Sequence, residues 1–194
     1  MFILYAVVAG LAAGWLMGGR VERLGQLRLK WPAAIVLGLG AQLVLFTEPV
    51  ARQVGEWGPF LYVAFTLVVV AAVVRNGAIP GMAVVSVGAA ANLVAVIANG
   101  GFMPASPAAL AAAGRVVPAV YSNTLVSSSP WLWPLTDIFA LPSWMPLANV
   151  FSVGDVLIGL GTALTLSLAM RPRHAAASDG RGEPLAAKGV ASEH

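Results

Sequence analysis

Asn99-Gly100-Gly101-Phe102-Met103-Pro104 opens the stretch that decides the fold, and Asn149-Val150-Phe151-Ser152-Val153-Gly154-Asp155 closes it. Between these two motifs lie only two charged residues, Arg115 and Asp137, and residues 99–155 hold seven of the 13 prolines. The stretch is too hydrophobic for an ordinary loop, and it has too many prolines for one membrane helix, because proline breaks helix interiors. We expect it to fold against a bilayer surface or into a helical bundle, with the rest of the chain as its support.

The composition is that of a membrane protein. Hydrophobic residues make up 59% of the chain, charged residues 10%, and the mean hydropathy is +0.84, which is outside the range of soluble domains. A chain of 194 residues has room for five or six spans of ~20 residues and little else. The isoelectric point of 9.8 does not predict a nucleic-acid partner, because the basic residues flank apolar runs instead of forming a patch.

Several kinds of chemistry are excluded by the residues that are missing or misplaced. The chain has no cysteine, which excludes disulfides, thiolate metal sites and cysteine nucleophiles. Its two histidines, His174 and His194, both fall in a polar C-terminal segment, so we expect no buried histidine base. The sequence implies no metal site and no cofactor.

The apolar runs predict an all-α integral membrane protein with a bundle of five transmembrane helices. The expected cap, residues 99–149, contains short interfacial helices, of which the clearest begins at Ser106-Pro107 and ends before Gly114. The segment 171–194 is polar and lacks apolar periodicity, so we expect a disordered cytoplasmic tail. The five spans are expected at about residues 2–19, 32–46, 59–74, 78–98 and 150–170.

The distribution of lysine and arginine predicts the orientation. With the N-terminus outside and the C-terminus inside, only Arg52 and Arg115 lie on the extracytoplasmic side, which is the asymmetry that the positive-inside rule describes. We therefore expect a multi-pass protein of the cell membrane whose cap is extracytoplasmic. The nine cytoplasmic residues are Arg20, Arg23, Arg28, Lys30, Arg75, Arg171, Arg173, Arg181 and Lys188.

Small residues recur at every fourth position in the first and fifth expected spans, which lets another helix approach closely. This pattern and the lack of reactive side chains favour a non-enzymatic subunit or accessory module, which associates with itself or with a membrane partner. The two series are Ala6, Gly10, Gly14 and Gly18, and Gly159, Ala163 and Ser167.

The polar residues in apolar surroundings each have two interpretations. Asn92 needs a partner, which is either another helix or a bound molecule, because an unpaired amide in a membrane costs several kcal/mol. Asp155 forms a capping box with Ser152, or it lies within the apolar region and binds a proton, a cation or an amine. Asp137 likewise has either a structural role or a role in binding a proton, a cation or an amine. The Asn99-Gly100-Gly101 sequence either ends a helix or lines a ligand.

At these positions the chain resembles an uncharacterised family of small multi-pass bacterial membrane proteins, a domain of unknown function. The resemblance is carried by NGGFMPAS at 99–106, LTDIFALP at 135–142 and PLANVFSVGDVLIGLG at 146–161. It implies a five-helix membrane protein and supplies no activity and no catalytic residues. The positions that match are Asn99, Gly100, Gly101, Met103, Pro104, Asp137, Asn149 and Asp155.

Three functional hypotheses follow. The first is the accessory module. The second is a binding or transport module for a lipid-like or other apolar small molecule, which requires a pocket of at least ~300 Å³ under the cap. The third is an intramembrane enzyme that acts on a lipid-linked substrate through Asp137 and Asp155. The candidate ligand-binding residues are Asn92, Asn99, Gly100, Gly101, Met103, Asp137, Asn149 and Asp155.

Overall fold

A computed structural model describes residues 2–116 and 122–172 of the chain, and it is mostly helical. Five apolar helices form near the expected positions. Most of the expected tail, residues 173–194, lies outside the described residues, so its predicted disorder remains a prediction. The five helices are α1 (Phe2–Leu16), α2 (Pro32–Leu45), α4 (Gly58–Val74), α5 (Met82–Ala98) and α7 (Val153–Ala169).

Within residues 2–116 and 122–172, one helical segment, Glu48–Val74, is long and apolar enough to cross a membrane by length and composition. It begins between the second and third expected spans, where the apolar runs predicted no helix. Residues 48–57 form α3 (Glu48–Val54) and a 3-10 helix (Gly55–Trp57) that lead into α4. Pro49 fits the first turn of α3, where its missing N–H costs nothing. Arg52 pairs with Glu48 one turn earlier along the same helix.

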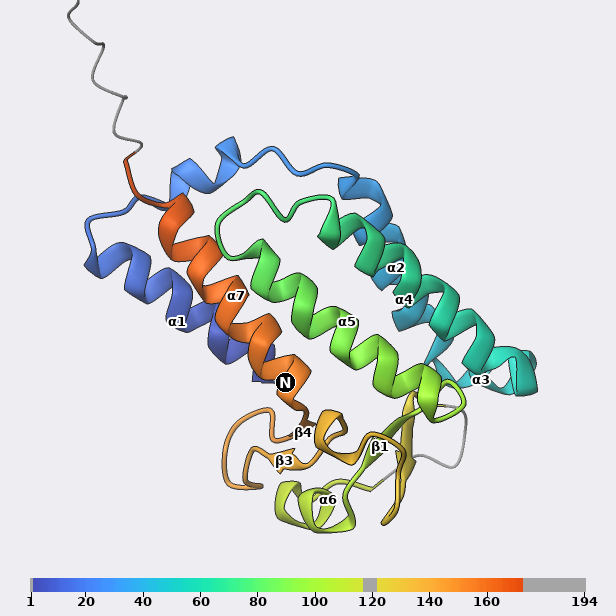
Figure 1. Cartoon of the computed structure of the whole chain (residues 1–194). Helices are drawn as coiled ribbons and strands as arrows, with labels where there is room; N and C mark the ends of the chain where they lie inside the picture. Colours follow the sequence, from blue (N-terminus) through green and yellow to red (C-terminus); the bar gives the residue numbers. More distant parts are fainter. Residues whose placement is uncertain (1, 117–121, 173–194) are drawn as a thin grey trace, which may run out of the picture.

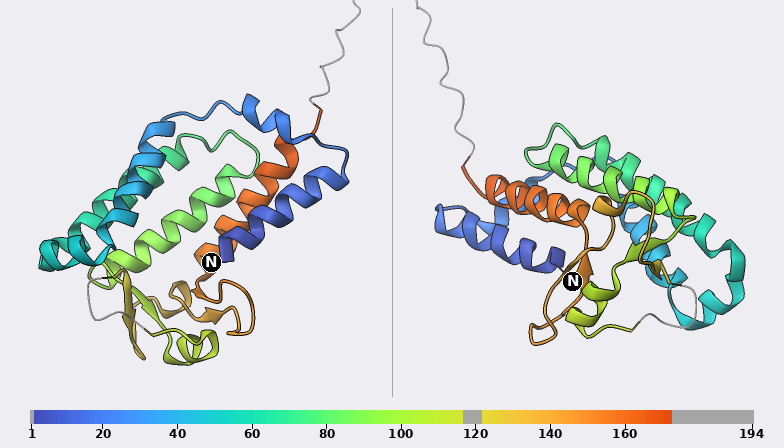
Figure 2. Two further views of the ribbon diagram at one scale, coloured as in Figure 1. Left: turned by 180° about the vertical axis from the view of Figure 1, so that it is seen from behind. Right: turned by 60° about the horizontal axis from the view of Figure 1, so that its bottom comes forward.

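The five long helices are arranged in the spatial order α1, α7, α5, α4, α2. Helix α7 packs between α1 and α5, and α4 packs between α5 and α2 (Figure 1). The views in Figure 2 show the same order from behind and from below. The last helix in sequence therefore lies beside the first, and it joins the N-terminal helix to the middle of the bundle.

The small residues of α1 and α7 bring these two helices into contact. A Cβ atom at Gly10 would lie 2.6 Å from the Cα atom of Ala163, and one at Gly14 would lie 3.1 Å from the Cα atom of Ser167. On the other side of the interface, a Cβ atom at Gly159 would lie 3.1 Å from the Cβ atom of Ala6. The predicted close packing is confirmed for Gly10 and Gly14, and within the chain it joins α1 to α7. Gly18 takes no part in it, because it lies beyond the end of α1 and has no atom within 4 Å of its Cβ position.

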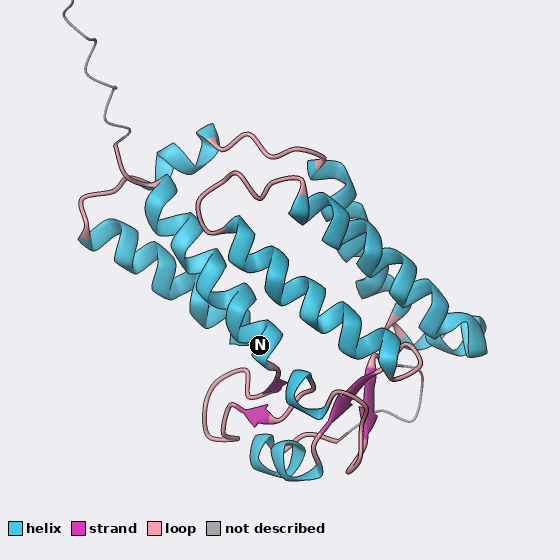
Figure 3. Ribbon diagram, viewed as in Figure 1, coloured by secondary structure: helices cyan, strands magenta, loops and turns pink. Residues whose placement is uncertain are grey.

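The cap, residues 99–149, differs from the expected set of short helices because it also contains strands (Figure 3). Strand β1 pairs with β2 in parallel, and β3 pairs with β4 in antiparallel orientation. The cap is rich in proline, which interrupts helices. Its backbone N–H and C=O groups pair across short extended segments instead. The cap elements are β1 (Met103–Ala105), α6 (Pro107–Ala113), β2 (Thr124–Val126), a 3-10 helix (Trp133–Leu135) and β3 (Phe139–Ala140), and β4 (Val150–Phe151) leads into α7.

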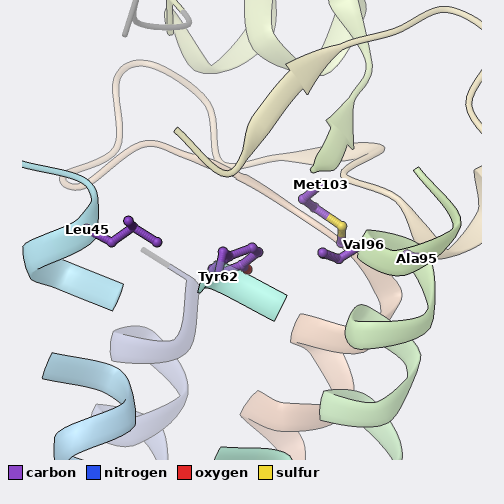
Figure 4. Close-up of a cluster of buried hydrophobic side chains, with 5 residues drawn as sticks. All are labelled: Leu45, Tyr62, Ala95, Val96 and Met103. Carbon is purple, nitrogen blue, oxygen red and sulfur yellow. The ribbon is translucent and has the colours of Figure 1, made fainter. Parts of the chain in front are cut away.

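A cluster of buried hydrophobic side chains joins the cap to the helices (Figure 4). It contains Leu45 of α2, Tyr62 of α4, Ala95 and Val96 of α5, and Met103 of β1. Because one cap strand shares a core with three helices, the cap is held against the end of the bundle.

The close contact between α1 and α7 predicts opposite effects for two glycine substitutions. Gly10→Ala should lower the free energy of unfolding by about 1–3 kcal/mol, because the new methyl group meets the backbone of α7. Gly40→Ala in α2 is the matched control: no atom lies within 4 Å of its Cβ position, so alanine should stabilise the helix by about 0.5–1 kcal/mol. Thermal unfolding in detergent, followed by circular dichroism, measures both. Equal effects would contradict the packing.

Candidate functional site

A cavity of about 710 Å³ lies where α4, α5 and α7 meet the cap. Its lining combines two carboxylates with amide, hydroxyl and guanidinium groups and with several apolar side chains. The polar lining residues are Tyr62, Asn92, Arg115, Ser122, Asn123, Thr124, Asp137, Asn149 and Asp155, and the apolar ones are Phe46, Val96, Met103, Leu110, Val116 and Val150.

One wall of the cavity is a hydrogen-bond network between α5 and the start of α7. The Nδ2 group of Asn92 donates to Oδ1 of Asp155 (2.8 Å), and the Ser152 hydroxyl donates to Oδ1 of Asn92 (2.7 Å). Ser152 and Asp155 also form the predicted capping box, in which each side chain accepts from the other residue's backbone N–H. Asn92 therefore bonds to another helix, which was one of the two partners considered for it, and it also lines the cavity.

The network requires an unusually close approach of the two helices. A Cβ atom at Gly154 would lie 2.0 Å from Oδ1 of Asn92, and a Cβ atom at Gly88 would lie 2.4 Å from the carbonyl oxygen of Gly154. Only glycine leaves the Asn92 amide room to reach both capping residues.

Asp137 enters the cavity from the cap and is held by its backbone. Its N–H donates to the carbonyl of Pro104 (2.9 Å), and its carbonyl accepts from the N–H of Ser106 (3.0 Å), which joins it to the end of β1. The residue is only 8% exposed, and its Oδ1 atom has no hydrogen-bond partner within residues 2–116 and 122–172. A buried carboxylate oxygen without a partner is costly, and in native structures it demands an explanation such as a bound group.

Burial raises the pKa of the Asp137 carboxyl from 3.8 to about 7, with a smaller contribution from the negative charge of Asp155. Arg115 lines the same cavity, but it forms no ion pair with Asp137: the ion pairs found within the described ranges are Arg20–Glu22 and Arg52–Glu48. The carboxyl therefore changes charge near neutral pH, so it can hold a proton or, once ionised, a cationic group.

The hydroxyl of Tyr62 adds a further polar group to the cavity and accepts a hydrogen bond from Nδ2 of Asn123 (3.4 Å). Nothing in the described part of the chain groups three or more His, Cys, Asp or Glu side chains as a metal site would. The cavity thus offers an ionisable carboxyl group and hydrogen-bonding groups beside an apolar surface.

Five of the eight candidate residues line the cavity: Asn92, Met103, Asp137, Asn149 and Asp155. Asn99, Gly100 and Gly101 are not part of its lining. They end α5, which was the other interpretation of these residues, and both glycines have positive φ angles. Asn99 also fixes the cap, because its side chain exchanges two hydrogen bonds with the backbone of Trp131.

Sequence reasoning missed Tyr62, Arg115 and Asn123 as lining residues. Tyr62 lies in the third expected span, residues 59–74, from which no candidate residue was chosen. A tyrosine near the start of an otherwise apolar helix was the available signal, because a buried tyrosine hydroxyl usually needs a polar partner. The position of Asn123 depends on the pairing of β1 with β2, which the sequence did not predict.

Residues 26–167 match a family of unknown function, DUF5317. The match includes α2, α4, α5, the cap and nearly all of α7, and it confirms the expected membership of an uncharacterised family, a domain of unknown function. The search of curated proteins found no match, and neither did the search of solved structures. The match therefore assigns the chain to a family and leaves its activity open.

The raised pKa of Asp137 predicts how stability depends on pH. Because the carboxyl binds its proton more tightly in the folded state, stability should fall as the pH rises from about 4 to about 7 and should then level off. Between about pH 5 and pH 8 the loss should be roughly 2–3 kcal/mol. Asp137→Asn should remove this dependence and should be more stable than the original chain at pH 8.

Thermal unfolding in detergent across this pH range measures the effect. Glu56→Gln is the matched control, because Glu56 is an exposed carboxylate outside the cavity, and this variant should keep the original pH dependence. An Asp137→Asn protein that loses stability with rising pH as the original does would show that another group titrates.

Proposed function

The chain belongs to the DUF5317 family, and we propose that it is a multi-pass membrane protein that binds a small amphipathic cation in the cavity under its cap. The observation that carries this proposal is the buried Asp137 carboxylate, whose Oδ1 atom has no partner in the described part of the chain, on the lining of a cavity of about 710 Å³. That volume lies within the range of about 300–1,000 Å³ that is typical of ligand sites.

The outer surface of the bundle supports a membrane location. All five long helices expose large apolar side chains, for example Val8, Leu37, Phe60, Val87 and Leu160. A soluble protein rarely exposes contiguous apolar surface on this scale, because it would aggregate.

The tryptophans add to this support. All six are at least 52% exposed, although tryptophan is among the most buried residues of soluble proteins. Trp15 and Trp31 lie at one end of the helices, and Trp57 and the three cap tryptophans lie at the other. This is the distribution of aromatic side chains at the two interfaces of a bilayer.

The charges support the expected orientation. The connections at the end of the bundle opposite the cap carry six basic residues, whereas Arg52 and Arg115 lie at the cap end. In our proposal the five long helices cross the membrane, although only Glu48–Val74 is long enough to do so by length and composition within the described residues. By the positive-inside rule, the cap and its cavity then face the extracytoplasmic side. The six residues are Arg20, Arg23, Arg28, Lys30, Arg75 and Arg171.

The lining of the cavity defines the chemistry of the occupant. An ammonium or similar group beside Asp137 would give the carboxylate the partner that it lacks, as a charge-assisted hydrogen bond. Tyr62, Asn123 and Asn149 supply neutral hydrogen-bonding groups, and Phe46 and Val96 supply apolar surface. Arg115 also lines the cavity and forms no ion pair in the described part of the chain. The occupant that we propose has a cationic or amine head beside Asp137 and an apolar part.

Two features weigh against the other hypotheses. Asp155 has both carboxylate oxygens engaged, by Asn92 and by the Ser152 N–H, which leaves it poorly suited to act with Asp137 as an acid–base pair. Gly10 and Gly14, which motivated the accessory-module hypothesis, are buried against α7. Because this face of α1 is already covered, it does not support association with a membrane partner or a second copy, which remains a prediction.

The proposal is tested by mass spectrometry of small molecules that copurify with the protein in native nanodiscs. We expect the original chain to retain an amphipathic amine. Asp137→Asn should retain about tenfold less, because it loses a charge-assisted hydrogen bond, and the Glu56→Gln control should retain the original amount. Retention should be stronger at about pH 8 than at about pH 5.5, because the carboxyl is ionised above its pKa. Equal retention by Asp137→Asn, or no retained amine in any sample, would refute the proposal.

A further inference from the structure

A second cavity, of about 460 Å³, lies at the opposite end of the bundle from the cap. It is enclosed by the 3-10 helix Val21–Gln26 and the residues after it, by the turn between α4 and α5, and by the C-terminal end of α7. Figure 1 shows these three segments at the same end of the molecule. We call this cavity the basic pocket, because Arg23, Arg28 and Arg171 line it.

The wall that carries Arg23 and Arg28 is fixed in place at both ends. The Arg20 N–H and Nη1 of Arg23 both donate to the carbonyl of Met170, at 2.9 and 3.0 Å. At the other end, the Lys30 N–H donates to Oδ1 of Asn76 (2.7 Å), and Nδ2 of Asn76 donates to the Lys30 carbonyl (2.9 Å). Asn76 itself is buried. The pocket is therefore formed before any ligand enters it.

The charge in the basic pocket is of one sign. Three arginines line it, and no acidic residue does so within the described part of the chain. The Arg171 guanidinium also donates to Sδ of Met17, which lies outside the lining. The nearest acidic residue in sequence, Glu22, is exposed and pairs with Arg20. Arg23 uses one N–H for Met170, and a guanidinium has five donors, so most of its hydrogen-bonding capacity remains. Three like charges around one cavity repel one another unless an anion lies between them.

The orientation of the protein in a membrane does not by itself explain why three arginines line one pocket. The positive-inside rule needs basic residues in the connection and is indifferent to the direction of their side chains. Arg75, at the same end, stacks on the ring of Trp31 at 4.6 Å and does not line the pocket. Arg20 likewise pairs with Glu22 outside it. Of the six basic residues at this end in the described part of the chain, three line the pocket: Arg23, Arg28 and Arg171.

We propose that the basic pocket binds a phosphate group, supplied by an anionic phospholipid of the adjacent leaflet. Guanidinium groups bind phosphate oxygens with paired hydrogen bonds, and basic pockets between membrane helices on the cytoplasmic side bind lipid headgroups. The choice of a lipid rests on the membrane location proposed above. Ile79 and Leu168 also line the pocket, so apolar surface that suits acyl chains lies beside the cations.

The test compares nanodiscs of phosphatidylcholine alone with nanodiscs that also contain phosphatidylglycerol, and it counts retained lipids by native mass spectrometry. We expect the original chain to retain phosphatidylglycerol selectively. Arg28→Gln and Arg171→Gln should each lower this retention about tenfold, the effect of one lost charge-assisted hydrogen bond. Arg75→Gln is the matched control: it removes the same charge from the same end, and it should keep the original retention.

A loss in Arg75→Gln equal to that in Arg28→Gln would overturn the proposal, because it would show general attraction to a negative surface. Absence of any preference for phosphatidylglycerol in the original chain would overturn it as well. Inorganic phosphate is tested separately, on protein in detergent. If it raises the unfolding temperature of the original chain but not of Arg28→Gln while no anionic lipid is retained in nanodiscs, the lipid is the wrong source and a soluble phosphate compound takes its place.

A failure of the proposal for the basic pocket can be told apart from a failure of the proposal for the cavity under the cap. Asp137→Asn should leave the retention of phosphatidylglycerol unchanged, because Asp137 lines only the cavity at the other end. If the protein does not enter nanodiscs at all, the membrane proposal fails, and the phosphate arm in detergent still tests the pocket.

Discussion

The close approach of α5 and α7 at Gly88 and Gly154 is the constraint on which the rest of the structure depends. Side chains at either glycine would collide with the opposite helix or with Asn92. Because both positions are glycine, the Asn92 amide reaches the capping box at the start of α7 and bonds with Ser152 and Asp155. An amide in an apolar bundle is stable only when it is paired, so the network fixes where α7 begins relative to α5.

Fixing the start of α7 also fixes the cap. Strand β4 immediately precedes α7 and pairs with β3, and Asn99 at the end of α5 binds the Trp131 backbone from the other side. Between these two attachments, β1 holds Asp137 by its backbone while leaving one carboxylate oxygen unsatisfied. Asp137 Oδ1 is the one buried side-chain nitrogen or oxygen atom without a hydrogen-bond partner in the described part of the chain, and its residue lines the cavity. Such a cost to stability is expected where function and stability compete.

The sequence predicted those features that depend on local patterns. Apolar runs located five helices, the spacing of small residues predicted that another helix approaches Gly10, and the Ser152–Asp155 spacing favoured the capping box. That the approaching helix is α7 of the same chain was not predicted. It did not predict the pairing of β1 with β2, because residues 103–105 and 124–126 are distant in sequence and carry no alternating pattern. Tyr62 and Asn123 were missed for the same reason: their contact depends on how the cap folds back on α4. For Asp137, the sequence left open a structural or a binding role, and the structure shows that the residue is buried and lines the cavity.

The measurement that tests this account most directly is a double-mutant cycle between Asn92 and Asp155. Unfolding free energies in detergent are compared for Asn92→Ala, Asp155→Ala, the double variant and the original chain. If the bond between α5 and α7 organises the cap, the two residues should be coupled by about 1–3 kcal/mol, and the double variant should lose less than the sum of the single losses. Effects that add to within about 0.3 kcal/mol would contradict the account, because they would show that the two residues act independently.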